Sequence, residues 1–174
     1  MLPTATLMTS VNKPGFSVEP VAAPSTPPKS SPGKQALEDS PARMTQQGSV
    51  EIHIKSASAL KPSGADGSAD PYVMLKMPGA KFWKSSAVQM RTLDPTWDEK
   101  LQIEGVLSDF VSGPMLLKVM DKDVLKDDRL GRLELSLEPL KYQDVIHFDG
   151  QQLHHTPSGT ISLSASWIPK HRRI

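Results

Sequence analysis

The sequence predicts an all-β fold, an eight-stranded antiparallel β-sandwich that follows a disordered N-terminal arm. Three observations support this prediction. Short segments alternate between apolar and polar residues, turn-forming residues separate these segments, and no long segment has the apolar spacing of an amphipathic helix. Short strands separated by turns in this way are typical of antiparallel sandwiches.

Alternation is clearest over residues 50–55 and 160–167, where every second residue is apolar. The predicted strands span residues 50–55, 71–77, 83–90, 97–103, 115–120, 130–137, 145–153 and 160–167. Two segments between them, 107–111 and 139–145, are candidates for single helical turns. Apolar residues at alternate positions share one face of a strand, so we expect these faces to form the core.

Residues 1–47 are expected to form a disordered arm rich in proline and serine. Half of the 16 prolines lie in this range, and its one aromatic residue is Phe16. Such a segment buries too little apolar surface to compensate for the conformational entropy lost on ordering. The folded domain is therefore predicted to span 48–169, with a basic tail over 170–174.

Two clusters of carboxylates lie between predicted strands. One cluster is Asp66-Gly-Ser-Ala-Asp70, and the other, between residues 121 and 128, contains four aspartates. Carboxylates this close together repel one another unless they are solvated or bind a cation. Ca²⁺ prefers about six to eight oxygen ligands, mostly from carboxylates and carbonyls. The sequence therefore predicts a calcium site where the clusters meet, and the alternative is two solvated charge runs.

Four motifs follow one another along the predicted domain. They are Asp70-Pro-Tyr-Val73, Thr92-Leu-Asp-Pro-Thr-Trp97, Asp121-Lys-Asp123 and Asp128-Arg-Leu-Gly131. In this order they resemble the C2 domain, a phospholipid-binding β-sandwich. The closing segment 156–167 is similar to the ends of extended synaptotagmin and tricalbin domains. Because no strand is predicted before Ser49, the resemblance implies the permutation in which a C-terminal strand completes the sandwich.

The resemblance also implies that aspartates from two loops at one end of the sandwich bind Ca²⁺. The implied metal ligands are Asp66, Asp70, Asp121, Asp123 and Asp128. Four of these match the aspartates of the family's motifs, and Asp66 is the exception. The usual position of its counterpart is occupied by Gly64. Either a shortened loop lets Asp66 serve as the ligand, or one ligand is missing.

Val124, Leu125 and Lys126 lie between the aspartates of the second cluster, at the expected tip of the loop. We expect them to contact the membrane, since apolar residues at a loop tip have no core to face. Full burial of a Val or Leu side chain contributes roughly 1.5–3 kcal/mol. The alternative is a small packing contact with the neighbouring loop.

A second, basic lipid site on the concave strands is a further implication of the resemblance. Lys76 and Lys84 are the candidates for it. The lysine pair that the family usually places on the next strand falls here near Ser85 and Ala87. This replacement weakens the expectation of a strong phosphoinositide site.

Composition argues against several other functions. The formal net charge of +1 does not suggest a nucleic-acid binder, and the absence of cysteine fits a reducing compartment. No apolar run approaches the roughly 18 residues that span a bilayer, and the N-terminus lacks a signal-peptide pattern. No nucleophile with a base, phosphate-binding glycine loop or zinc spacing is found. We therefore expect neither an enzyme nor a small-molecule substrate.

The sequence thus predicts a cytoplasmic, peripheral membrane protein of signalling or membrane trafficking. Its expected function is calcium-dependent binding to anionic phospholipid membranes through the two acidic loops, with Ca²⁺ as the cofactor. The alternative is a calcium-independent module that uses the sandwich and the Pro-rich arm to bind a protein partner.

Overall fold

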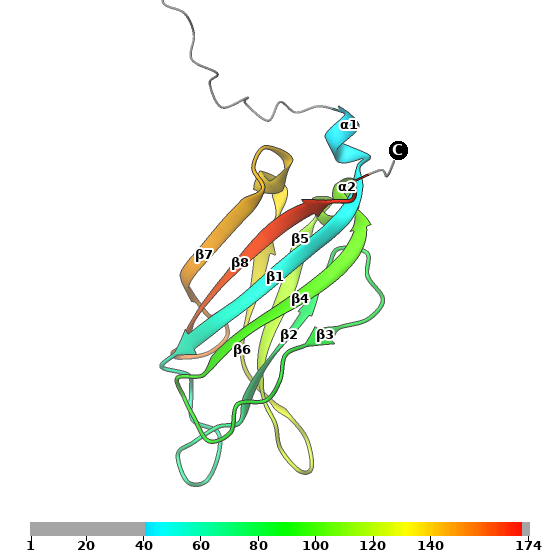
Figure 1. Ribbon diagram of the computed structural model, residues 1–174. Helices are drawn as coiled ribbons and strands as arrows, with labels where there is room; N and C mark the ends of the chain where they lie inside the picture. The colour runs from blue at the N-terminus through cyan, green and yellow to red at the C-terminus, as the bar shows by residue number, and fades with distance from the viewer. Residues whose placement is uncertain (1–40, 172–174) are drawn as a thin grey trace, which may run out of the picture. The chain divides into compact units, whose positions relative to one another are not determined.

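Two four-stranded antiparallel sheets pack face to face (Figure 1). The computed structural model describes residues 41–171, so most of the predicted arm and the end of the basic tail lie outside the described residues. The strand order is β4-β1-β8-β7 in one sheet and β3-β2-β5-β6 in the other. This arrangement confirms the predicted β-sandwich.

Except for β3, the bounds of the elements follow the sequence pattern closely. The strands are β1 (Gln47–Ser58), β2 (Pro71–Lys76), β3 (Lys84–Ser85), β4 (Thr96–Val106), β5 (Pro114–Asp121), β6 (Asp128–Ser136), β7 (Val145–Gln152) and β8 (Thr160–Pro169). The helical turns are α1 (Pro41–Met44), α2 (Leu107–Phe110) and the 3-10 turn η1 (Glu138–Lys141). Both predicted helical turns are therefore present as α2 and η1.

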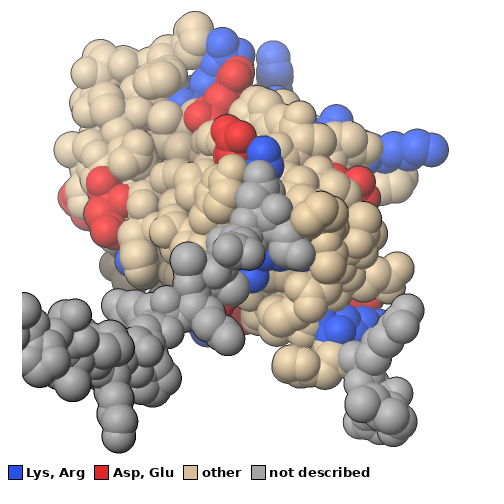
Figure 2. Space-filling view, turned by 90° about the horizontal axis from the view of Figure 1, so that it is seen from above, with Lys and Arg blue, Asp and Glu red and all other residues tan. Residues whose placement is uncertain are grey.

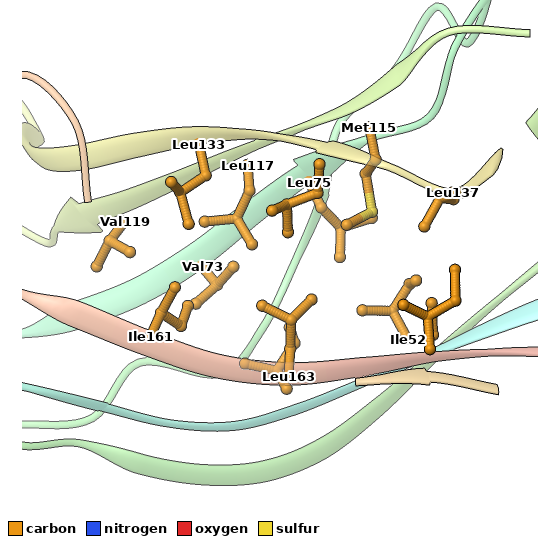
Figure 3. Close-up of a cluster of buried hydrophobic side chains, with 14 of the residues drawn as sticks. Ile52, Val73, Leu75, Met115, Leu117, Val119, Leu133, Leu137, Ile161 and Leu163 are labelled. Atoms are coloured by element: carbon orange, nitrogen blue, oxygen red, sulfur yellow. The ribbon is translucent and has the colours of Figure 1, made fainter. Parts of the chain in front are cut away.

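The core lies between the inner faces of the two sheets. Ile52 and Leu163 of one sheet face Val73 and Leu117 of the other (Figure 3), and all four side chains are buried. Trp167 is also buried, with its ring centroid 6.2 Å from that of Phe110 in α2. Alternation places these residues inward because successive side chains of a strand point to opposite faces.

The C-terminal strand completes a sheet, as expected. Strand β8 lies between β1 and β7, and Ile52 is in register with Ala165. Strand β1 reaches the opposite edge strand through the pairing of Ile52 with Leu101 in β4. The first and last strands of the domain therefore depend on each other for their hydrogen bonds.

The predicted strand over 83–90 is mostly irregular in the structure. Only Lys84–Ser85 forms β3. Beyond it, the Ser86 hydroxyl accepts a hydrogen bond from the Val73 N–H at 2.9 Å. A side chain thus replaces a carbonyl as the partner of β2, which interrupts the regular pairing.

Strand β1 is preceded by α1, which Arg43 attaches to the sandwich. The Arg43 side chain is 12% exposed and donates to the carbonyl oxygens of Leu140 and Gln143 at 3.0 and 3.1 Å. It also pairs with the Asp144 carboxylate at 2.8 Å. The chain therefore enters the domain beside η1, at the end where β1 begins (Figure 1).

Gly131 in β6 gives a test of the packing. A Cβ atom at this position would lie 2.8 Å from the Leu153 Cβ atom, whereas a Cβ atom at Gly113 would meet nothing closer than 3.7 Å. We expect Gly131→Ala to lower the free energy of unfolding by about 1–3 kcal/mol, the usual range for overpacking. Urea unfolding measures this change, with Gly113→Ala as the matched control. Equal stabilities of the two variants would contradict the close contact.

Candidate functional site

The two acidic loops meet at one end of the sandwich because the strands beside them are paired. Pro71 at the start of β2 is in register with Asp121 at the end of β5. Asp70 therefore adjoins the second acidic loop, and its carbonyl oxygen accepts a hydrogen bond from the Lys122 N–H at 2.9 Å. In Figure 1 both loops extend from the end of the sandwich opposite α1.

Asp121 lies at the centre of this junction and is only 8% exposed. One carboxylate oxygen accepts a hydrogen bond from the Asp70 N–H at 2.6 Å, and the other accepts one from the Ser63 hydroxyl. The Asp70 carboxylate in turn accepts from the Arg91 N–H at 2.6 Å. Asp121 and Asp70 thus connect the loop before β2 to the loops before β4 and after β5.

Asp66 is directed toward groups near its own loop. Its carboxylate accepts hydrogen bonds from the Ser68 hydroxyl at 2.6 Å and the Ser68 N–H at 3.0 Å. The Arg91 guanidinium lies 3.2 Å from its other oxygen. The two Ser68 hydrogen bonds, and secondarily Arg91, lower the pKa of Asp66. The Asp66 carboxyl is therefore ionised at neutral pH.

Asp127 accepts hydrogen bonds from three other residues. The Tyr72 hydroxyl donates at 2.6 Å, the Lys122 ammonium at 3.1 Å and the Asp123 N–H at 3.1 Å. The Tyr72 hydrogen bond is the largest cause that lowers the pKa of Asp127. Burial, and then Asp127, raises the pKa of Tyr72 to about 12. The sequence places Asp127 in the second acidic cluster but does not reveal its partner Tyr72, which is 55 residues away.

The five predicted ligands are not equally close together. Asp70 and Asp128 each adjoin Asp121, through the β2–β5 and β5–β6 pairings, whereas Asp123 lies in the exposed loop beyond them. Within residues 41–171, no three or more His, Asp or Glu side chains are grouped so that they could hold a metal ion. The donor types suit a hard cation, but the Asp66 carboxylate is turned toward Arg91.

Val124 and Leu125 are 97% and 95% exposed, and Lys126 is exposed as well. The alternative expectation, a packing contact with the neighbouring loop, is therefore wrong. Figure 2 views the molecule from above, at the end away from these loops, and shows basic and acidic side chains interspersed on the visible face.

A family model for the C2 domain matches residues 48–152. The chain belongs to the C2 domain family. It is 32% identical over 123 residues to human multiple C2 and transmembrane domain-containing protein 1. This match covers 70% of this chain and 11% of the human protein. It is 30% identical over 95 residues to an Arabidopsis thaliana calcium-dependent lipid-binding protein. This match covers 55% of this chain and 18% of the Arabidopsis protein. The chain thus spans less than a fifth of either relative.

Solved structures agree with this assignment. The calcium-bound pair of C2 domains from extended synaptotagmin 2 matches with a TM-score of 0.60 and 23% identity, over 70% of this chain and 46% of that one. The resemblance to extended synaptotagmins is therefore confirmed at the level of the fold. Among residues 41–171 no helix is long and apolar enough to cross a membrane.

The outer face of the sheet β3-β2-β5-β6 carries basic residues on three strands. Lys76 in β2 lies on this face, and Lys118 in β5 is in register with Arg132 in β6. The Lys118 ammonium is 4.3 Å from the centroid of the Trp83 ring, beside a cavity of about 250 Å³ that these two residues and Arg132 line. The other candidate, Lys84, instead donates to the Gln102 carbonyl of β4 at 3.3 Å.

Sequence reasoning did not select Lys118 or Arg132. The signal that could have found them is the alternation of β5 and β6. Leu117 and Leu133 are buried, so the residues beside them, Lys118 and Arg132, point outward. Pairing of the two strands then places two like charges next to each other, which is unfavourable, and Glu134 lines the same cavity with the opposite charge.

The pKa of Asp66 provides a test of the loop geometry. Ser68→Ala should raise this pKa toward its ordinary value, and Arg91→Ala should raise it less, because Ser68 is the larger cause. The lowered pKa stabilises the folded protein above about pH 4, and this contribution is lost as pH falls through the folded-state pKa. Carboxyl NMR titration measures both shifts. A larger shift in Arg91→Ala would contradict the assigned order.

Proposed function

We propose that this C2 domain binds anionic phospholipid membranes peripherally and that Ca²⁺ is required for the binding. The meeting of two acidic loops, through the hydrogen bond between the Asp70 N–H and the Asp121 carboxylate, carries this proposal. The calcium-bound state of a structural neighbour and the name of the Arabidopsis relative support it. The domain acts as a binding module and not as an enzyme.

The proposed metal ligands are the five aspartates of the two loops. They are Asp66, Asp70, Asp121, Asp123 and Asp128. Ca²⁺ would supply the positive charge that allows this acidic end to approach an anionic surface. For Asp66 to act as a ligand, its carboxylate has to turn away from the exposed Arg91 guanidinium and from the Ser68 hydroxyl and N–H that donate to it. Ligation by Asp66 would therefore replace hydrogen bonds that its carboxylate makes within the protein.

The loop tip is the proposed point of membrane contact. Val124 and Leu125 are almost fully exposed, so their insertion gains apolar burial without breaking a contact inside the protein. Each contributes at most roughly 1.5–3 kcal/mol, and Lys126 adds about 1 kcal/mol near an anionic surface. Contributions of this size support reversible binding.

A second lipid contact is proposed on the outer face of β2, β5 and β6. Lys76 is retained from the two original candidates, and Lys118 and Arg132 join it there. Lys118 and Arg132 are in register on paired strands, and neither makes an ion pair within residues 41–171. Lys84 remains a weaker candidate, because its ammonium group is bound to Gln102. Binding through this face should weaken as salt screens the charges.

Vesicle sedimentation tests the calcium dependence. Wild-type protein should pellet with phosphatidylserine vesicles when Ca²⁺ is present and stay in solution with a chelator. The double variant Asp121→Asn/Asp123→Asn should lose this response, because both substitutions remove negative charge from the second loop. Asp109→Asn, at the exposed surface of α2, is the matched control.

Pelleting of the double variant at the wild-type level would contradict the proposed role of the acidic loop. Calorimetry of the wild type with Ca²⁺ alone gives an independent measurement. If no heat is observed at millimolar Ca²⁺ and no vesicles pellet, a calcium-independent protein-interaction module becomes the better description.

The contribution of the loop tip can be separated from calcium binding. Val124→Ser/Leu125→Ser should weaken vesicle binding about ten-fold or more, the loss expected when a few kcal/mol of apolar burial is removed. The calcium affinity measured without vesicles should not change, since neither side chain is a proposed ligand. The matched control is Val145→Ser, because Val145 is 41% exposed in β7. Unchanged vesicle binding would exclude the tip as the point of insertion.

A further inference from the structure

Asp127 accepts hydrogen bonds both from its own loop, the second acidic loop, and from β2. Its side chain is 21% exposed and accepts hydrogen bonds from Tyr72, Lys122 and Asp123. Asp127 is absent from the proposed ligand set, and no role described above uses it. A carboxylate with three donor residues in a loop of exposed side chains requires a separate explanation.

The Tyr72 hydrogen bond links two distant parts of the chain. Tyr72 lies in β2, two positions after Asp70, and its neighbours Pro71 and Val73 are buried. Its hydroxyl therefore lies on the outer side of the sheet, where it donates to Asp127 at 2.6 Å. The strand that follows the first acidic loop is thereby joined to the end of the second.

The Asp123 N–H closes the loop. Its hydrogen bond to Asp127, at 3.1 Å, brings the two ends of the segment 123–127 together. Between them, Val124 and Leu125 are almost fully exposed and have no packing contact that would fix their direction. The Asp127 carboxylate therefore restrains this segment beyond the pairing of Asp121 with Asp128, and Tyr72 donates to that same carboxylate.

We propose that Tyr72 and Asp127 are positioning residues that fix the orientation of Asp123 and of the Val124–Leu125 tip. This inference rests on the proposed function, because the orientation matters through Ca²⁺ and the membrane. The two residues act through the loop and do not touch the ion. Removing either one should let the loop adopt more conformations, and a binding-competent conformation would then be populated less often.

The experiment combines amide hydrogen exchange with calcium titration on the full chain. Tyr72→Phe and Asp127→Ala should each speed exchange of the Asp123 amide about two- to ten-fold, the range corresponding to one hydrogen bond. Each should weaken Ca²⁺ binding by a similar factor. The double variant should be no weaker than Asp127→Ala alone, since the two residues act through the same contact. Circular dichroism confirms that each variant is folded, and Tyr72→Phe is the conservative change.

Two substitutions serve as matched controls. Tyr142→Phe alters the second of the two tyrosines, and Glu104→Gln removes an exposed carboxylate in β4. Both should leave the exchange of the Asp123 amide and the calcium affinity at wild-type values. If losing any tyrosine hydroxyl or any negative charge had the same effect, amide exchange and calcium affinity would change in the controls as well. That result would overturn the inference.

The outcomes separate this inference from the proposed function. If the wild type binds Ca²⁺ but Tyr72→Phe and Asp127→Ala change neither exchange nor affinity, the inference is overturned and the proposed function stands. If Asp127→Ala weakens binding while Tyr72→Phe does not, Asp127 acts directly on the ion and the positioning role is overturned. If the wild type binds no Ca²⁺, the proposed function fails, and exchange of the Asp123 amide alone decides whether the pair holds the loop.

Discussion

The pairing of β2 with β5 is the constraint on which the acidic end of this C2 domain depends. It places Pro71 opposite Asp121, and the Asp121 carboxylate then accepts the hydrogen bond of the Asp70 N–H. A buried carboxylate that lost this donor and Ser63 would carry an uncompensated desolvation cost of about 1–3 kcal/mol or more. The contact therefore stabilises the fold independently of any bound ion.

The residues that stabilise the domain and the exposed residues of the loop tip lie in different parts of the structure. Buried residues such as Ile52 and Val73 lie between the sheets, whereas Val124 and Leu125 project from a loop beyond them. Binding loops carried on a rigid scaffold are common, because loop residues can change without cost to the core. The loop end can thus vary while the sandwich is unaffected.

Each acidic loop has its own basic residue. Arg91 pairs with Asp66, and Lys122 pairs with Asp127. These pairs reduce the repulsion among the carboxylates. They also show why a list of aspartates does not describe the site fully, since some of the carboxylates are engaged with the protein itself.

The sequence by itself determined the sandwich, its closing strand and the identity of the acidic loops, because alternation over segments such as 160–167 is a local property. Only the tertiary structure decided which carboxylates adjoin. It joined Asp127 to Tyr72 across 55 residues and turned Lys84 toward β4, away from Lys76. Long-range hydrogen-bond partners depend on the register of strands far apart in the chain, and no local pattern encodes that register.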